Sequence, residues 1–267
     1  MGAHYSPSPP VSFLDFLFPK KCLGCGKKGK YFCPACLNKA EIIGFPVCPV
    51  CRRPSPFGRT HPKCQTRYAL DGLTSVFAYR GLIRKGIKDL KFRFRFDLSG
   101  ELISLLLNRN IVKSLQFLDL KRTIVVPIPL HPWREDWRGF NQAAVLAKIL
   151  AEKLNLPFYE NLLVRTRYTE SQTGLKKEER QENVENAFKI NEKYISVNQR
   201  RRPNETLGLK SGPWTAYQRK SESYGIQIPR SVILFDDVWT TGATMQTCAN
   251  LLKRAGFEKV WGLTLAR

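Results

Sequence analysis

The sequence has no long hydrophobic run. Within its 267 residues no apolar stretch approaches the ~20 residues needed to span a bilayer. The first residues lack the basic start of a signal peptide, and Asp15 interrupts the apolar segment that follows them. We therefore expect neither a membrane-spanning nor a secreted protein, and a cytoplasmic location. A hydrophobic fraction of 43% and a charged fraction of 25% are ordinary for a globular chain of one or two domains.

Acidic residues are also scarce. There are 22 of them against 44 lysines and arginines, which gives a net charge of +22. The excess is largest in residues 1–70, whereas residues 231–267 are nearly neutral. Such a field favours nucleic acid, phosphorylated small molecules or an anionic membrane surface, here the inner face of the cytoplasmic membrane. A surface that only keeps the protein soluble is the alternative.

Seven of the eight cysteines fall between residues 22 and 64. With one histidine they form four consecutive pairs, each with two residues between its members. The eight side chains are Cys22, Cys25, Cys33, Cys36, Cys48, Cys51, His61 and Cys64. Two thiolates at this spacing reach one tetrahedral Zn²⁺ from a tight turn, and four ligands hold one structural ion. The pattern predicts one or two structural zinc ions, in a segment too short to fold on a core of its own.

The pairing of these ligands stays open at this point. The simplest assignment is sequential, with the first four ligands on one ion and the last four on another. An interleaved pairing and the loss of one ion are alternatives. A disulfide framework would need an oxidising compartment and would leave one of the seven cysteines unpaired. Cys248 lies far away on an expected helix, and we interpret it as a buried small hydrophobic residue.

From about residue 73 onward, expected strands and helices alternate. The expected strands are 73–79, 123–128, 162–165, 187–190, 232–235 and 260–265, and the expected helices are 82–90, 98–112, 143–154 and 247–255, with a loop after 128 that holds Pro129, Pro132 and Gly139. This order predicts an α/β fold with a mostly parallel sheet flanked by helices. We divide the chain into a zinc-binding module over 1–70 and an α/β domain over 71–267. Residues 191–230 have no apolar period and are interpreted as a basic, mobile insertion.

A short stripe at 91–96 alternates basic and aromatic side chains. Lys91, Arg93 and Arg95 could grip the phosphates of single-stranded DNA while the phenylalanines between them stack on bases. The simpler interpretation, which we favour, is a half-buried strand with its aromatic side chains inward and its charges outward.

The strongest chemical signal is the string V-I-L-F-D-D-V-W-T-T-G-A-T at 232–244. A buried strand ends in two acids, Asp236 and Asp237, and a threonine- and glycine-rich turn then opens a helix. The turn consists of Thr240, Thr241, Gly242, Ala243 and Thr244. Backbone N–H groups and hydroxyls at a helix start suit a phosphate, and the paired carboxylates suit sugar hydroxyls. Together they describe a site for a ribose 5-phosphate. The G-x-G-x-x-G turn of a dinucleotide site is absent from the sequence.

This string resembles the 5-phosphoribosyl-1-pyrophosphate (PRPP) motif of type I phosphoribosyltransferases. Six further features occur in a fixed order: the zinc-type pairs, L-K-F at 90–92, V-P-I-P-L-H-P-W-R at 126–134, R-G-F-N-Q-A at 138–143, R-T-R-Y-T-E-S-Q-T-G-L at 165–175, and R-Q-E-N-V at 180–184 followed by A-F at 187–188. Together they are similar to the ComF/GntX family, phosphoribosyltransferase-like proteins tied to DNA uptake in natural competence. The resemblance covers nearly the whole chain. It departs from the family at His61, where a cysteine is usual, and in the length of 191–230.

The resemblance implies roles for particular residues. Asp236 and Asp237 would hold the ribose hydroxyls and 240–244 the 5-phosphate. The loop after 128 would take the pyrophosphate through Leu130, His131, Arg134 and Arg138. A mobile loop over 168–183 would close on the reaction with Gln172, Lys176, Lys177 and Arg180. Mg²⁺ would sit mainly on PRPP oxygens and water.

Two functions follow as expectations. One is a phosphoribosyltransferase that displaces pyrophosphate from PRPP with an acceptor that the sequence does not reveal. The other is a non-catalytic competence factor that handles single-stranded DNA and uses the fold as a scaffold or ligand sensor. The family also implies a zinc module that docks other DNA-uptake proteins, such as a helicase.

Overall fold

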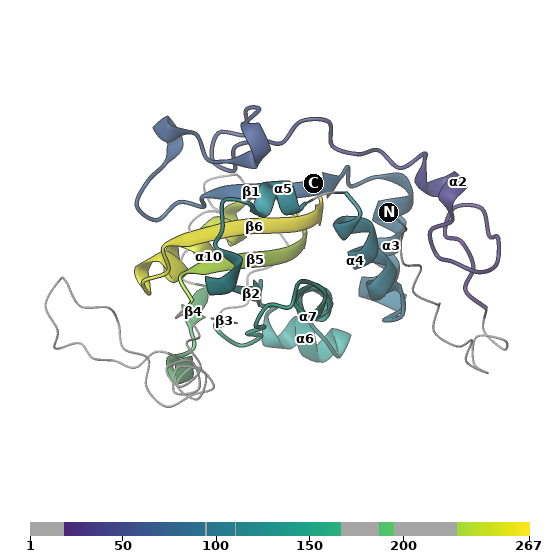
Figure 1. Ribbon diagram of the computed structural model, residues 1–267. Coiled ribbons are helices and arrows are strands. Elements are labelled where there is room, and N and C mark those ends of the chain that lie inside the picture. The colour runs from purple at the N-terminus through teal and green to yellow at the C-terminus, as the bar shows by residue number, and fades with distance from the viewer. Residues whose placement is uncertain (1–18, 94, 110, 167–186, 195–228) are drawn as a thin grey trace, which may run out of the picture.

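The computed structural model describes residues 19–93, 95–109, 111–166, 187–194 and 229–267 (Figure 1). Its centre is a four-stranded sheet in the order β1-β6-β5-β2, and all three strand pairs are parallel. The strands are β1 (Gly72–Phe77), β2 (Thr123–Pro127), β5 (Ser231–Val238) and β6 (Lys259–Ala266). The expected α/β fold with a parallel sheet is thereby confirmed.

Successive residues of β5 face opposite sides of the sheet and enter two separate cores. Ile233 and Phe235 pack with α3 (Gly81–Arg93), α4 (Leu98–Leu107) and α7 (Gln142–Leu154). Val232 and Leu234 pack with α10 (Ala243–Arg254) on the other face. This alternation is the strand period of two, and because both faces are covered the strand is continuously hydrophobic. The sheet is therefore buried between two helical layers.

The segment between the two cysteine groups runs along the free edge of β1 (Figure 1). The Ile43 N–H donates to the Val76 carbonyl at 2.9 Å, and the Thr60 N–H donates to the Asp71 carbonyl at 3.0 Å. On the opposite edge, the Tyr159 N–H donates to the carbonyl of Val125 in β2 at 3.0 Å. Backbone segments thus cover parts of both outer strands, which would otherwise offer unpaired groups.

The short elements complete the fold. They are α2 (Pro34–Leu37), η1 (Pro56–Gly58), η2 (Pro62–Cys64), α5 (Val112–Leu115), η3 (Leu120–Arg122), α6 (Pro132–Arg138), β3 (Leu163–Arg165), β4 (Phe188–Ile190) and η4 (Glu192–Tyr194). Strands β3 and β4 form an antiparallel pair outside the main sheet. Along the residues described, no helix is long and apolar enough to cross a membrane.

Three local predictions were wrong. The expected loop at 129–139 contains helix α6, and the expected helix over 98–112 ends at Leu107 and gives way to the separate turn of α5. The stripe at 91–96 is not the half-buried strand that we favoured, because 91–93 form the last turn of α3. Loose amphipathic alternation occurs in both short helices and strands, and at 91–93 the helix that begins at Gly81 continues through it.

Candidate functional site

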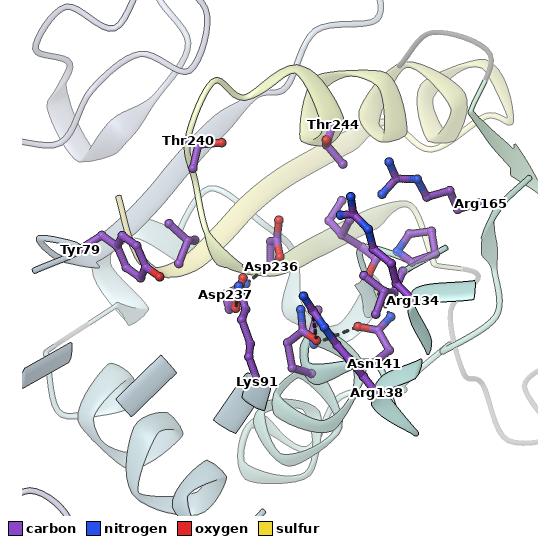
Figure 2. Close-up of a pocket in the computed structure, with 16 residues that line it drawn as sticks. Tyr79, Lys91, Arg134, Arg138, Asn141, Arg165, Asp236, Asp237, Thr240 and Thr244 are labelled. Carbon is purple, nitrogen blue, oxygen red and sulfur yellow. Dashed lines mark hydrogen bonds and ion pairs between the residues drawn. The ribbon is translucent and has the colours of Figure 1, made fainter. Parts of the chain in front are cut away.

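A cavity of about 280 Å³ opens beside the carboxyl ends of the neighbouring strands β2 and β5. Helix α7, which follows β2 and α6, covers one face of the sheet, and α10, which follows β5, covers the other. Such a switch in direction leaves a crevice between adjacent strands, where open α/β sheets bind their ligands. Figure 2 shows Asp236 and Asp237 in the middle of this opening, with Thr240 and Thr244 on one side and Arg134 and Arg138 on another.

The two acids at the end of β5 have different partners. Asp237 is buried, and its Oδ2 lies 2.5 Å from Nζ of Lys91 on α3. The pKa of Lys91 is raised, because the attraction of Asp237 outweighs the opposing effect of burial. Oδ1 of Asp236 accepts the backbone N–H of Asp237 at 2.8 Å. Among the described residues, only Asp237 of the two therefore has a cation in direct contact.

The pKa of Asp236 is strongly raised at its place on the sheet edge. Burial raises its pKa to about 8, the neighbouring charge of Asp237 acts in the same direction, and Lys91 acts against both. A carboxyl group that keeps a proton near neutral pH can donate a hydrogen bond as well as accept one. Perturbed acids of this kind are concentrated at functional sites.

The turn after β5 is shaped for close approach. Gly242 has φ 82°, a left-handed conformation that favours glycine, and a Cβ built there would lie 2.7 Å from Nε1 of Trp239. Thr240 and Thr244 line the cavity. The Ala243 N–H has a long contact of 3.5 Å to Oγ1 of Thr241, which is a weak hydrogen bond that an anion can replace. Thr240 and Thr244 thus share one cavity with the acids, whereas Thr241, Gly242 and Ala243 line a second cavity.

The predicted pyrophosphate residues divide into two groups. Leu130, Arg134 and Arg138 line the cavity. His131 instead begins helix α6, where its Nδ1 accepts the N–H of Trp133 at 3.2 Å. Burial and the charges of Arg165 and Arg134 lower the pKa of His131, which favours the neutral ring that such a cap needs.

Three arginines gather on one side of the cavity. They are Arg134, Arg138 and Arg165, and they come from α6 and β3. Burial lowers the pKa of Arg138 and of Arg165, and the charge of Arg134 lowers both further. Partly buried guanidinium groups that repel one another favour a bound anion, which would relieve the repulsion and offset the cost of desolvation.

Sequence reasoning gave five polar cavity residues no role or a different one, and Arg165 is the first of them. Tyr79 follows β1, Asn141 and Gln142 begin α7, and Lys91 was assigned to nucleic acid. Asn141 fixes the local geometry: its Nδ2 donates to the Ile128 carbonyl at 3.1 Å, and its Oδ1 accepts the Ala143 N–H at 3.0 Å. Its place directly before a periodic helix was a visible capping signal. Nothing local in the sequence indicates that Lys91 faces an acid 146 positions away.

Two other predicted groups are not among the described residues that line the cavity. Gln172, Lys176, Lys177 and Arg180 fall outside the described residues. Arg93 and Arg95 both pair with Asp89, at 3.5 and 3.4 Å. Lys91, Arg93 and Arg95 therefore do not form one exposed row.

The cysteine-rich segment forms two separate groups of potential metal ligands. Cys22, Cys25, Cys33 and Cys36 make one, and Cys48, Cys51, His61 and Cys64 make the other; within each group the ligand atoms all lie within 4.8 Å of one another. This is the sequential grouping. The Sγ atoms of Cys25 and Cys33 are 3.7 Å apart, close to the ~3.8 Å edge of a tetrahedron with Zn–S bonds of about 2.3 Å. All eight cysteines are free, which argues against the disulfide alternative.

His61 completes the second group with one ring nitrogen and anchors itself with the other. Its Nδ1 lies 3.3 Å from Sγ of Cys51, and its Nε2 lies 3.0 Å from the Pro54 carbonyl oxygen. A metal-binding histidine usually donates its second N–H in this way, which fixes the tautomer and the ring orientation. The residues present therefore fit a closed, structural zinc site.

Comparison with known proteins supports the zinc interpretation of the cysteine-rich segment. A double zinc ribbon domain matches residues 13–65. The chain is 28% identical to Competence protein F of Haemophilus influenzae over 273 residues, which cover 96% of this chain and all of that protein. It is 28% identical to Competence protein ComFC of Bacillus subtilis, covering 90% and 86% of the two chains. The resemblance to the ComF family is confirmed.

A further relative carries a different name. DNA utilization protein YhgH of Escherichia coli K12 is 26% identical over 251 residues, covering 91% of this chain and 87% of that protein. The similarity to each of these three relatives covers at least 90% of this chain, so it extends over both the cysteine-rich segment and the α/β region.

Proposed function

We propose that the cavity between β2 and β5 binds PRPP and that the protein transfers its phosphoribosyl group to an acceptor. One observation carries this proposal: the acid pair, Thr240 and Thr244 of the turn, and the arginine group line the same cavity. These are the three kinds of group that ribose hydroxyls, a 5-phosphate and a pyrophosphate require. Nε of Arg138 is buried and, among the described residues, has no hydrogen-bond partner, which suits a site prepared for an anion.

In the proposed reaction, the bond between C1 of the ribose and the pyrophosphate oxygen breaks while a bond from C1 to the acceptor forms. Asp236 and Asp237 would orient the ribose, and Arg134 and Arg138 would receive the negative charge that develops on pyrophosphate. Mg²⁺ held by the pyrophosphate oxygens and water would neutralise part of that charge. Because Lys91 already balances Asp237, the acid pair needs no metal of its own.

The names of the relatives support a biological setting for the proposed activity. Two are named competence proteins and one a DNA utilization protein. We infer a role in DNA uptake or use, in the cytoplasm, with the basic first third able to meet partner proteins or an anionic membrane surface.

Calorimetry with PRPP and Mg²⁺ tests the site directly. We expect binding to the wild type and a loss of about tenfold in Asp236→Ala, since leaving buried ribose hydroxyls without their hydrogen-bond partner costs about 1–3 kcal/mol. Glu258→Gln is the matched control, because Glu258 lies at the opposite end of the sheet and pairs with Arg230 on the surface. Absence of binding to the wild type would refute the proposal. If PRPP binds, release of pyrophosphate in the presence of an acceptor would show that the protein is an enzyme and not only a PRPP-binding protein.

A second candidate function is the handling of single-stranded DNA without catalysis. The observation that favours it is the net charge of +22 in a chain similar to a DNA utilization protein. It predicts DNA affinity that is independent of PRPP turnover and falls with salt.

A further inference from the structure

Arg52 joins the second group of metal ligands to the turn after β5. Its Nη2 donates to the backbone carbonyl of Thr241 at 2.5 Å, across 189 positions of sequence. Its guanidinium also lies over the ring of Trp239, 5.3 Å from the centroid. Both partners belong to the short segment that leads from the acid pair into α10. One side chain of the ribbon therefore contacts the turn at two points.

The base of Arg52 is fixed by the ribbon itself. Arg52 directly follows Cys51, and its own N–H donates to the Cys48 carbonyl at 2.9 Å. Its φ of 61° places it in the left-handed region, as the residue that closes the turn around these two cysteines. The direction in which the side chain leaves the backbone is thus set by the geometry of the metal-ligand turn.

The contact between Arg52 and Thr241 lies at the wall of a second cavity. This cavity, of about 910 Å³, lies between the ribbon and the start of α10, and Arg52, Thr241 and Gly242 are among the residues that line it. Two other ion or hydrogen-bond contacts hold the ribbon end against α10: Gln246 Nε2 donates to the Tyr68 carbonyl at 3.2 Å, and Lys253 Nζ lies 2.7 Å from Asp71 Oδ2. These two contacts hold the body of the helix, whereas Arg52 reaches the turn.

The hydrogen bond to Thr241 fixes the orientation of one peptide unit. In a trans peptide the C=O and the following N–H point in opposite directions. With the Thr241 carbonyl directed to Arg52, the N–H of Gly242 points away from the ribbon. That N–H belongs to the turn whose outer members, Thr240 and Thr244, line the 280 Å³ cavity. The packing of Gly242 against Trp239, which Arg52 covers, restrains the same peptide from its other end.

We propose that Arg52 is a positioning residue that holds the turn at 240–244 in its anion-binding shape, so that the second zinc ribbon forms part of the phosphate site. This inference rests on the proposed PRPP function but goes beyond it. It says that Arg52 of the ribbon holds the shape of the turn, and this does not depend on which acceptor is used. The ligand concerned is the terminal phosphate of a phosphorylated sugar. Arg52 acts through the backbone and need not touch it.

The test compares Arg52→Asn with Arg53→Asn. Asparagine tolerates the left-handed conformation, so the metal-ligand turn keeps its shape while the reach to Thr241 is lost. Arg53→Asn removes the same charge from the next position. Two quantities are measured: the affinity for PRPP with Mg²⁺ by calorimetry, and amide hydrogen exchange in a peptide covering 239–244. Zinc content and the melting temperature are recorded for each variant.

We expect Arg52→Asn to lose about tenfold or more in affinity and to exchange faster at 239–244, with zinc content unchanged. Arg53→Asn should match the wild type in both measurements, and Arg52→Lys should recover part of the affinity because its ammonium can reach a carbonyl. Wild-type exchange and affinity in Arg52→Asn would overturn the inference. If the wild type binds no PRPP, the proposed function fails, and the exchange measurement alone still decides whether Arg52 holds the turn.

Discussion

Asp236 and Asp237 are neighbours in sequence but differ in their electrostatic surroundings. Asp237 has Lys91 against it, whereas Asp236 has burial and a second negative charge. The folded chain therefore holds a proton on Asp236 up to a pKa of about 8, while the unfolded chain releases it near its ordinary value of 3.8. Between these values the folded state binds more protons, so the free energy of unfolding falls as the pH rises.

Replacing Asp236 by asparagine should remove this dependence. We expect Asp236→Asn to match the wild type near pH 4 and to be more stable at pH 8 by at least about 1–2 kcal/mol, because asparagine carries no charge to bury. Urea unfolding of both proteins at the two pH values measures the difference. An identical difference at pH 4 and pH 8 would contradict the assignment of a raised pKa. The same variant should lose PRPP affinity, as a residue that trades stability for binding would.

The pair of Lys91 and Asp237 predicts a strongly non-additive double mutant. Asp237→Asn alone leaves a buried ammonium without its partner and should cost about 3 kcal/mol or more. Lys91→Met alone leaves the carboxylate and should cost a similar amount. The double variant should recover a large part of the loss, because neither charge then remains. Chemical denaturation of the four proteins measures the coupling, and simple additivity of the two losses would show that the ion pair does not form.

At the scale of elements, patterns confined to one segment were predicted well. The strands at 123–127 and 231–238 and the helix over 142–154 follow from apolar runs and helical spacing. Helix α6 was missed although Pro132 at its first turn and Gly139 after its last are ordinary start and stop signals. Pro129, Pro132 and Gly139 were interpreted as signs of a loop. A helix of seven residues is too short to show a clear apolar periodicity that would have argued against this.

Contacts between distant elements could not be predicted in the same way. The acid pair and the threonine-rich turn were identified from one string, since strand, acids and helix start are contiguous there. Arg165, Tyr79 and Lys91 meet them only because three other elements converge on the same end of the sheet. The contact of Arg52 with Thr241 depends on how the ribbon docks, which no local pattern specifies. The part of the cavity formed by residues 236–244 could therefore be predicted from the sequence, whereas the residues that other elements bring to it could not.

The ribbon segment and β1 form a further unit at this scale. Backbone hydrogen bonds at Ile43 and Thr60 cover part of the β1 edge, and both residues lie between or within the ligand groups. Chelating the zinc should unfold the ribbons, since so short a segment depends on its metal, and should uncover this edge. We expect the protein to self-associate while its helical circular dichroism largely persists. Light scattering during chelation and after return of Zn²⁺ measures the effect, and a chelated protein that stays monomeric would contradict it.

For the whole molecule, the net charge of +22 sets the interaction with polyanions. Single-stranded DNA bound through about five phosphate contacts should lose about a hundredfold in affinity between 50 and 200 mM salt. The three basic residues of the 91–96 stripe differ in how well they can reach a DNA phosphate. Arg93 is 63% exposed and Arg95 39% exposed, whereas Lys91 is only 18% exposed and paired with Asp237.

Removing the two exposed arginines therefore tests the DNA interaction without touching the cavity. Arg93→Gln/Arg95→Gln should lower the salt slope by about one to two phosphate contacts, because each exposed guanidinium that meets a phosphate releases counterions. Its PRPP affinity should equal that of the wild type, since neither residue lines the cavity. Fluorescence anisotropy with a labelled oligonucleotide over a salt series gives the slope. An unchanged slope would exclude these arginines from the DNA contact, and affinity independent of salt would exclude electrostatic binding by the molecule as a whole.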